Sequence, residues 1–170
     1  MRGFLQSRRE GRVSGRKSLR NRRQRTGATI VETAFVLPVF FIFVFGIIEF
    51  GHATMVSNVM KNACRTAARW GSATGATTAE VEAYARARMS VVNQNFVTIE
   101  IKAASQFDNG GGVPTSQEDF RSMPDIELGD AEPRQLFMVR ASIRYGDISL
   151  IPHPWLGNAL LSGQTFTRHE

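Results

Sequence analysis

An apolar run from residue 28 to residue 48 sets the strongest limit on how this chain folds. Its 21 residues carry a single charged side chain, Glu32, and the 16 residues from Thr33 to Ile48 carry none. A helix needs roughly 20 mostly apolar residues to cross a bilayer. The run therefore predicts one transmembrane helix over residues 28–50, with Glu49 at its far end.

Two residues are unexpected in this run. An ionised carboxylate inside hydrocarbon costs roughly 2.5 kcal/mol or more, so a simple anchor has no use for Glu32. Either Glu32 meets a positive partner, or it stays hydrated at the cytoplasmic interface. Pro38 lacks a backbone N–H, and we expect it to kink the helix and to favour packing against partner helices.

The basic residues gather in front of the apolar run. Residues 1–26 hold ten of the 21 Arg and Lys but only one of the 15 Asp and Glu, so the rest of the chain is mildly acidic. Few apolar side chains accompany these charges, and we expect residues 1–27 to form a disordered leader. Because basic flanks stay cytoplasmic, the leader predicts a single pass through the cytoplasmic (inner) membrane, with the N-terminus inside and the head outside. Nucleic-acid binding is the less favoured alternative, since nothing downstream is typical of such a fold.

The helical pattern continues past the membrane. Apolar or small residues recur every three or four positions up to Trp70, and they predict an alanine-rich face around Ala63 and Ala67 that packs closely against other elements. Thr77, with Glu80 three residues later, predicts the capping box of a second helix. The other sides of the first helix carry cations that we interpret as a solvated face: Lys61, Arg65 and Arg69.

Two stretches downstream alternate between apolar and polar residues, which is typical of strands with one buried face. They cover residues 95–104 and 135–147 and are expected to pair antiparallel, while the closing GQTFTR offers a third strand. The Gly-, Pro- and acid-rich segment 105–134 between them is predicted to be a long loop. The sequence thus predicts an α+β head over residues 51–170, with a second helix and an antiparallel sheet of two to three strands.

No catalytic or metal-binding set is evident in the sequence. His52, His153 and His169 are scattered, and His153 lies between two prolines. Cys64 is the single cysteine, so it is either buried among the alanines or free to pair between chains. We therefore expect neither an enzyme nor a cofactor or metal site.

The residues around the start of the apolar run resemble a known signal. A basic leader, Gly27 and then ATIVE, with the acid fifth after the glycine, are similar to the class III signal of type IV pilin-like proteins. With the proline-containing run, GIIEFG and KNACRTAARWG, the segment from about Thr26 to Gly71 resembles the TadE family of pseudopilins from tight-adherence pilus systems. The resemblance implies a pilin-like fold and a membrane-anchored structural or assembly component of a tight-adherence (Flp-type) pilus or a related secretion system.

The resemblance also implies roles for single residues. In such families a membrane-embedded prepilin-type aspartyl peptidase cuts after the glycine, which here would remove residues 1–27 and leave Ala28 as the N-terminus. Glu32, about one helical turn along, would neutralise the new ammonium in the same subunit or in a neighbour. Membrane lipid, the peptidase, other pilins or pseudopilins and the pilus assembly platform are the implied partners.

Glu49 falls near the far membrane interface, where we expect it to be hydrated, and a contact with a partner subunit is the sharper alternative. One alternative function also stays open for the chain. It is an uncleaved single-pass membrane protein whose outer head binds a ligand or a surface. The mature N-terminus distinguishes the two, being Ala28 in the first and Met1, or the residue after it, in the second.

Overall fold

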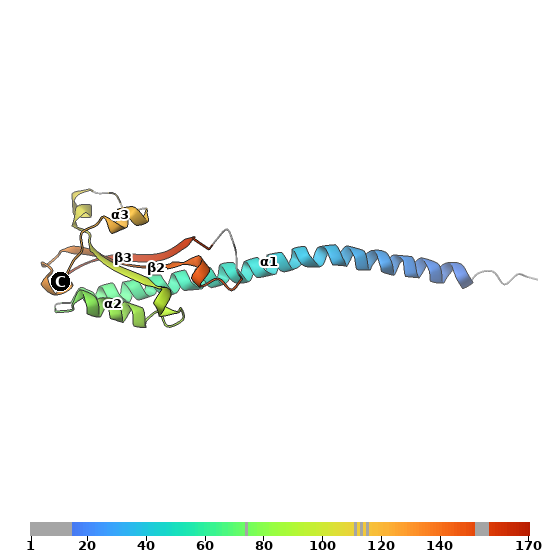
Figure 1. Cartoon of the computed structure of the whole chain (residues 1–170), viewed down its shortest axis with the longest axis horizontal. Coiled ribbons are helices and arrows are strands. Elements are labelled where there is room, and N and C mark those ends of the chain that lie inside the picture. Colours follow the sequence, from blue (N-terminus) through green and yellow to red (C-terminus); the bar gives the residue numbers. More distant parts are fainter. Residues whose placement is uncertain (1–14, 74, 111, 113, 115, 152–156) are drawn as a thin grey trace, which may run out of the picture. The chain divides into compact units, whose positions relative to one another are not determined.

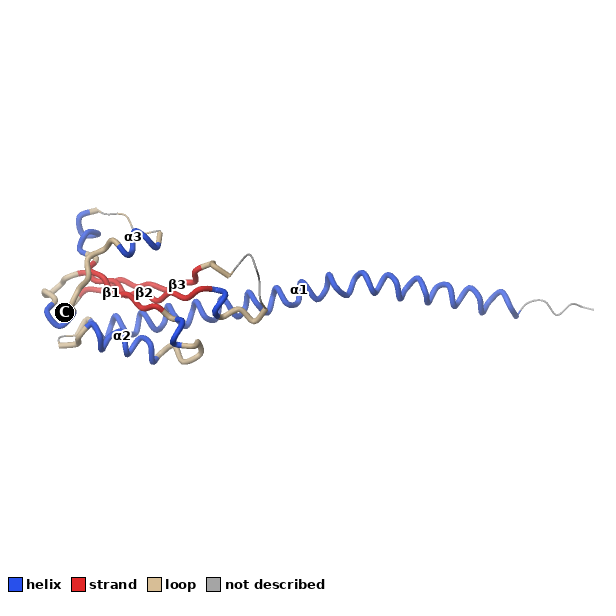
Figure 2. The backbone as a smooth tube through the Cα atoms, in the orientation of Figure 1, coloured by secondary structure: helices blue, strands red, loops and turns tan. Residues whose placement is uncertain are grey.

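The computed structural model describes residues 15–170, except for residues 74, 111, 113, 115 and 152–156. The chain divides into two compact units, residues 1–46 and residues 47–170. The predicted α+β class is confirmed, since helices and one antiparallel sheet are both present (Figures 1 and 2). Apart from short 3-10 turns, the described helices and strands are, in chain order, α1 (Gly15–Gly71), α2 (Thr78–Ala87), β1 (Thr98–Ala103), α3 (Gln117–Arg121), β2 (Leu136–Arg144) and β3 (Leu160–Arg168).

The first helix begins earlier than the sequence predicted. α1 starts at Gly15, so the expectation of a disordered leader is wrong for residues 15–27, which are helical. Residues 1–14 lie outside the described residues. Propensity gives the physical reason, because Arg, Lys, Gln and Leu lose little side-chain freedom in a helix. A helix that has already formed downstream also extends without a new nucleus.

The second helix begins with the predicted capping box. The Thr77 hydroxyl accepts a hydrogen bond from Glu80 N at 3.3 Å, while Thr77 N donates to Glu80 Oε2 at 3.0 Å. These bonds lower the pKa of the Glu80 carboxyl, and the backbone N–H of Thr77 contributes most. Val81 and Ala85, one turn apart, are buried. α2 therefore turns an apolar stripe toward the core, as its sequence predicts.

The three strands form one antiparallel sheet in the order β1-β2-β3. The two central predictions are confirmed, because β1 and β2 pair antiparallel with Ile99 opposite Ala141. The third strand is also present, but it begins at Leu160 and pairs along the whole of β2, with Ala141 opposite Gly163. Figure 1 shows the sheet running along the second half of α1, with α2 beside that helix.

One face of the sheet packs on α1 and α2. Ala63 and Ala67 of α1 lie in this core and expose no more than 3% of their surface. Because alanine side chains are short, they let the backbone of α1 come close to the sheet. Alternate residues of β2 fill the same core and are buried: Phe137, Val139, Ala141 and Ile143.

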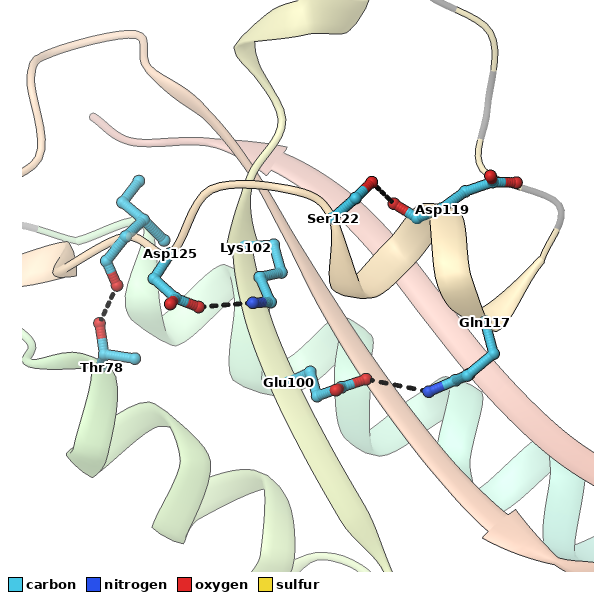
Figure 3. Close-up of polar contacts among 8 residues, drawn as sticks. Thr78, Glu100, Lys102, Gln117, Asp119, Ser122 and Asp125 are labelled. Atoms are coloured by element: carbon cyan, nitrogen blue, oxygen red, sulfur yellow. Dashed lines mark hydrogen bonds and ion pairs between the residues drawn. The ribbon is translucent and has the colours of Figure 1, made fainter.

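The other face of the sheet is covered in part by the segment 105–134, which contains α3. Met138 of β2 is buried there together with Ala104, Phe120 and Met123. The predicted loop thus carries a small apolar cluster of its own. Figure 3 shows three of the polar contacts that hold it to the head: Gln117 Nε2 to Glu100 Oε2 at 3.4 Å, Lys102 Nζ to Asp125 Oδ1 at 2.5 Å, and Thr78 Oγ1 to Ile126 O at 2.9 Å.

The edge strand β3 touches the backbone of α1 at Gly163. A Cβ atom on Gly163 would lie 2.6 Å from Lys61 N and 2.9 Å from Met60 C, which is too close for any side chain. Cys64 donates its Sγ–H to Gly163 O at 3.3 Å. Burial raises the pKa of the Cys64 thiol to about 11. Of the two possibilities for this cysteine, the structure shows the buried one.

We predict that Gly163→Ala destabilises the head, because the added methyl group must push β3 away from α1. The expected loss is about 1–3 kcal/mol in the free energy of unfolding, as at other overpacked sites. Urea unfolding of the detergent-purified protein, followed by tryptophan fluorescence, measures this loss.

Gly129→Ala is the matched control, since a Cβ atom there has no neighbour closer than 3.8 Å. Its free energy of unfolding should stay within about 0.5 kcal/mol of the wild-type value. Equal stabilities of the two variants would contradict the close approach of β3 to α1.

Candidate functional site

The apolar part of α1 in the first unit is exposed in the structure. Within the described residues, α1 is the one helix long and apolar enough to cross a membrane. A helix that is apolar on every side needs an apolar surrounding, which is either lipid or partner helices. This part of α1 is compatible with a single-pass membrane protein. Its exposed large side chains are Ile30, Val31, Phe35, Val36, Leu37, Val39, Phe40, Phe41, Ile42, Phe43 and Phe45.

The predicted cleavage signal lies on an open stretch of this helix. A Cβ atom on Gly27 would meet nothing within 4 Å, and Ala28 and Glu32 are both exposed. Residues four apart share one face of a helix, and their Cα atoms are separated by about 6 Å along the axis. Among the residues that the structure describes, Glu32 has no hydrogen bond or ion pair. Its carboxylate therefore remains available to a partner outside the described residues.

Pro38 lies inside α1, and the helix continues through it. Because proline has no N–H, the carbonyl of Ala34 loses its usual partner one turn later. In a bilayer such a carbonyl is satisfied by water, by a side chain or by a neighbouring helix. The kink and the packing role of Pro38 stay predictions.

Glu49 is buried, and its carboxylate is bonded to the head. Only 6% of its surface is exposed. Its Oε1 accepts a hydrogen bond from the Tyr145 hydroxyl at 2.6 Å, and Leu150 N donates to both of its oxygens at 3.2 and 3.3 Å. The expected hydration of Glu49 is therefore wrong, because two protein donors replace water. Its position at the membrane interface stays a prediction.

Tyr145 follows β2 directly and holds the end of the sheet to α1. Its backbone N donates to Ala159 O at 2.7 Å, which joins the chain after β2 to the chain before β3. Burial raises the pKa of Tyr145 to about 12, and the hydrogen bond and the charge of Glu49 add to the shift. Sequence reasoning missed this pair because 96 positions separate the two residues. The available signal was a buried hydroxyl at a strand end, which needs an acceptor.

The other predicted residues lie apart from these positions. Ala63 and Ala67 are in the core of the head. His52 is on α1, His169 follows β3, and His153 lies outside the described residues. In the described part of the chain, no group of three or more His, Cys, Asp or Glu side chains is placed to hold a metal ion. The candidate site therefore consists of the open stretch from Gly27 to Glu32 and the apolar helix that follows it.

In a comparison with known protein families, residues 27–69 match the model of a family described as TadE-like protein. The match covers about a quarter of the chain and includes the stretch from Gly27 to Glu32 and the apolar helix that follows it. The predicted resemblance is confirmed for this segment. No curated protein and no solved structure matches the chain.

We predict that Tyr145→Phe lowers the free energy of unfolding by about 1–3 kcal/mol, because it removes the shorter of the two hydrogen bonds to Oε1 of the buried Glu49 carboxylate. Chemical unfolding of the detergent-purified protein measures the change. Tyr84→Phe is the matched control, since the Tyr84 hydroxyl meets Arg88 on the exposed surface. If both variants were as stable as the wild type, Glu49 and Tyr145 would not be joined as described.

The same pair predicts an unusual tyrosine titration. The chain has two tyrosines, so Tyr84→Phe leaves Tyr145 alone to be followed by tyrosinate absorbance. Its midpoint should lie near pH 12 and should fall in the additional variant Glu49→Gln. Since the fold favours neutral Tyr145, its contribution to stability is complete below about pH 10 and is lost as the pH rises through 12. A midpoint near 10, with the fold intact by circular dichroism, would contradict the burial.

Proposed function

We propose, from the TadE-like match of residues 27–69, that this chain is a membrane-anchored structural or assembly component of a tight-adherence pilus or a related secretion system, processed after Gly27. That match carries the proposal because it covers the Gly27–Glu32 signal and the apolar helix together. The role is structural and not catalytic. The α+β head makes contacts between subunits, and the helix holds the chain in the membrane until assembly.

The proposed location is the cytoplasmic (inner) membrane, crossed once. Ten Arg and Lys in residues 1–26 favour a cytoplasmic N-terminus, because basic flanks resist translocation. The head then lies on the outer side. Residue 28 would be close to the cytoplasmic face, within reach of a peptidase that is itself embedded in the membrane.

Processing after Gly27 requires a local opening of α1, since the bond to Ala28 lies within the helix. Glycine is about 1 kcal/mol less favourable than alanine inside a helix, so the chain opens more readily at this position than at its neighbours. The free space around Gly27 supports the proposal, because an approaching backbone meets no side chain of the described residues there. A prepilin-type aspartyl peptidase is the proposed enzyme.

Cleavage would create an ammonium group at Ala28, one turn from Glu32. Neither charge is stable alone in hydrocarbon, but a close pair with further hydrogen bonds offsets much of the desolvation. Glu32 would pair with the ammonium of its own chain or with that of a neighbour. Pairing between chains would join subunits of a pilus, while the exposed apolar side chains of the same helix pack against other pilins or pseudopilins and the assembly platform.

One feature of α1 favours the alternative function. The bond between Gly27 and Ala28 lies inside a continuous helix, and it stays uncut unless this helix opens locally. In that case the head would bind a ligand or a surface on the outer side. The mature N-terminus separates the two functions.

We predict that Gly27→Phe blocks processing and that Glu32→Gln permits processing but prevents assembly. A bulky side chain at Gly27 obstructs the peptidase, whereas Glu32→Gln leaves the cut site intact and the new ammonium unpaired. Gel mobility reports the removal of about 27 residues from the N-terminus, mass spectrometry identifies Ala28, and co-purification with other pilus components reports assembly.

Two controls match these variants. Gly46→Phe places the same side chain on the same helix, again with nothing within 4 Å, and should leave processing intact. Glu32→Asp keeps the carboxylate and should retain part of the assembly. The proposal fails if Gly27→Phe still yields the shortened protein. If the Glu32→Gln variant assembles normally, the proposed pairing between Glu32 and the Ala28 ammonium is wrong.

A further inference from the structure

A pocket on the head gathers three cations from two distant parts of the chain. Its volume is about 380 Å³, and it lies within the second unit. Two of the cations come from α1, and the third comes from β2. The lining residues are Lys61, Arg65, Pro114, Arg140, Ser162 and Gln164.

Arg140 is the buried member of this group. It exposes 7% of its surface, and its guanidinium lies over the Phe120 ring, 4.5 Å from the ring centre. Its Nε is buried without a hydrogen-bond partner among the described residues. Buried charges are normally paired and hydrogen-bonded. The Arg140 guanidinium therefore lacks an acceptor for its Nε–H.

The acid opposite Arg140 in the sheet, Glu100, does not form an ion pair with it in the described residues. Glu100 stands opposite Arg140 in the register of β1 and β2, and its charge opposes the lowering of the Arg140 pKa that burial causes. Yet the described residues show no ion pair between the two. Glu100 accepts instead from Gln117 Nε2 at 3.4 Å (Figure 3). With three cations and one acid, the pocket keeps an excess of positive charge.

Lys61 and Arg65 are exposed and lie four residues apart on α1, so they share one face. Like charges at this spacing repel each other. Neither side chain has a hydrogen bond or an ion pair among the described residues. The sequence suggested an ordinary solvated face, whereas the structure places both cations at the same pocket as Arg140.

Gly163 explains how the three cations converge. Because it has no side chain, β3 lies directly against α1 at Met60 and Lys61. Neighbouring residues of a strand point to opposite faces, so Ser162 and Gln164 are turned away from this contact. They bring a hydroxyl and an amide, which are both hydrogen-bond donors, to the pocket that the cations line.

The geometry points to a binding site for a phosphate group. A free phosphate or a phosphate monoester carries more than one negative charge at neutral pH, and a phosphodiester carries one. Both have several acceptor oxygens, which suits a set of three cations and two neutral donors. Arginine and lysine are the usual phosphate-binding side chains. The pocket exceeds the size of the ion alone, so it admits a phosphate that is part of a larger molecule.

Two sources would present this group, namely a soluble phosphate and the headgroup of an anionic phospholipid. Lys61 comes 13 residues after Ile48, the last residue of the uncharged run. This separation is about 20 Å of helix, which favours the soluble source when the helix stands upright in the membrane. The experiment has one arm for each source.

The test uses the full-length protein in phosphatidylcholine nanodiscs. Thermal unfolding is compared in sodium phosphate and in sodium chloride at equal ionic strength. Phosphate also stabilises proteins without binding to a site, so the diagnostic quantity is the rise in Tm of the wild type minus that of Lys61→Ala/Arg65→Ala. We expect the wild type to gain roughly 4 °C more at saturating phosphate.

Arg69→Ala is the matched control, because Arg69 is an exposed cation of α1 that does not line the pocket. It should keep the full response. Arg65→Glu, which places a negative charge at the pocket, should lose it. Both variants change exposed side chains, so the fold should stay intact.

The second arm replaces part of the phosphatidylcholine with phosphatidylglycerol, in chloride alone. A rise in Tm that depends on Lys61 and Arg65 in this arm, but not with free phosphate, identifies the lipid headgroup as the source. The reverse pattern identifies soluble phosphate. If the double variant and the wild type respond equally in both arms, the proposed site does not exist.

Discussion

The head depends on how closely α1 approaches the sheet. Ala63 and Ala67 keep the helix side of this contact short, and Gly163 removes the side chain on the strand side. Close contact increases the dispersion attraction among all the buried atoms around it, and each of these interactions is small alone but large in sum. The larger residues of β2 fill the same core: Phe137, Val139 and Ile143. A side chain at Gly163 would disturb the core, the Cys64 hydrogen bond and the pocket together.

A polar contact acts on the same helix nearer to the apolar run. Glu49 accepts from the Tyr145 hydroxyl and from Leu150 N, so α1 is held to the segment after β2 by hydrogen bonds as well as by packing. A buried carboxylate is costly unless it is fully bonded, and it therefore tolerates few alternative arrangements. On α1, Glu49 of the polar contact and Met60 of the Gly163 contact are eleven residues apart. Together the two contacts determine which face of this part of the helix packs on the sheet.

Much of this architecture could be predicted from local patterns. The apolar run, the capping box at Thr77 and the alternation in β1 and β2 are short-range signals, and each one corresponds to an element of the structure. The burial of Arg140 could not be predicted in this way, because alternation assigned it to an open face that α3 and its neighbours cover. The bond between Glu49 and Tyr145 likewise joins positions with no common local pattern. The helical residues 15–27 were missed because charge and low hydrophobicity were given more weight than helix propensity. For the candidate site, the sequence located Gly27, Ala28 and Glu32, and the structure added that they are open and that Glu32 is unpaired within the described residues.

The burial of Cys64 beneath β3 makes the single thiol a reporter of local opening. In the closed head its sulfur faces Gly163 O, and its raised pKa leaves little of the reactive thiolate at neutral pH. A thiol reagent should therefore react mainly in the brief intervals when β3 separates from α1. The labelling rate then measures the equilibrium between closed and open forms of this edge, in the same way as amide hydrogen exchange. Since the chain contains one cysteine, the signal arises from one position, and any ligand or neighbouring subunit that holds β3 in place would slow it.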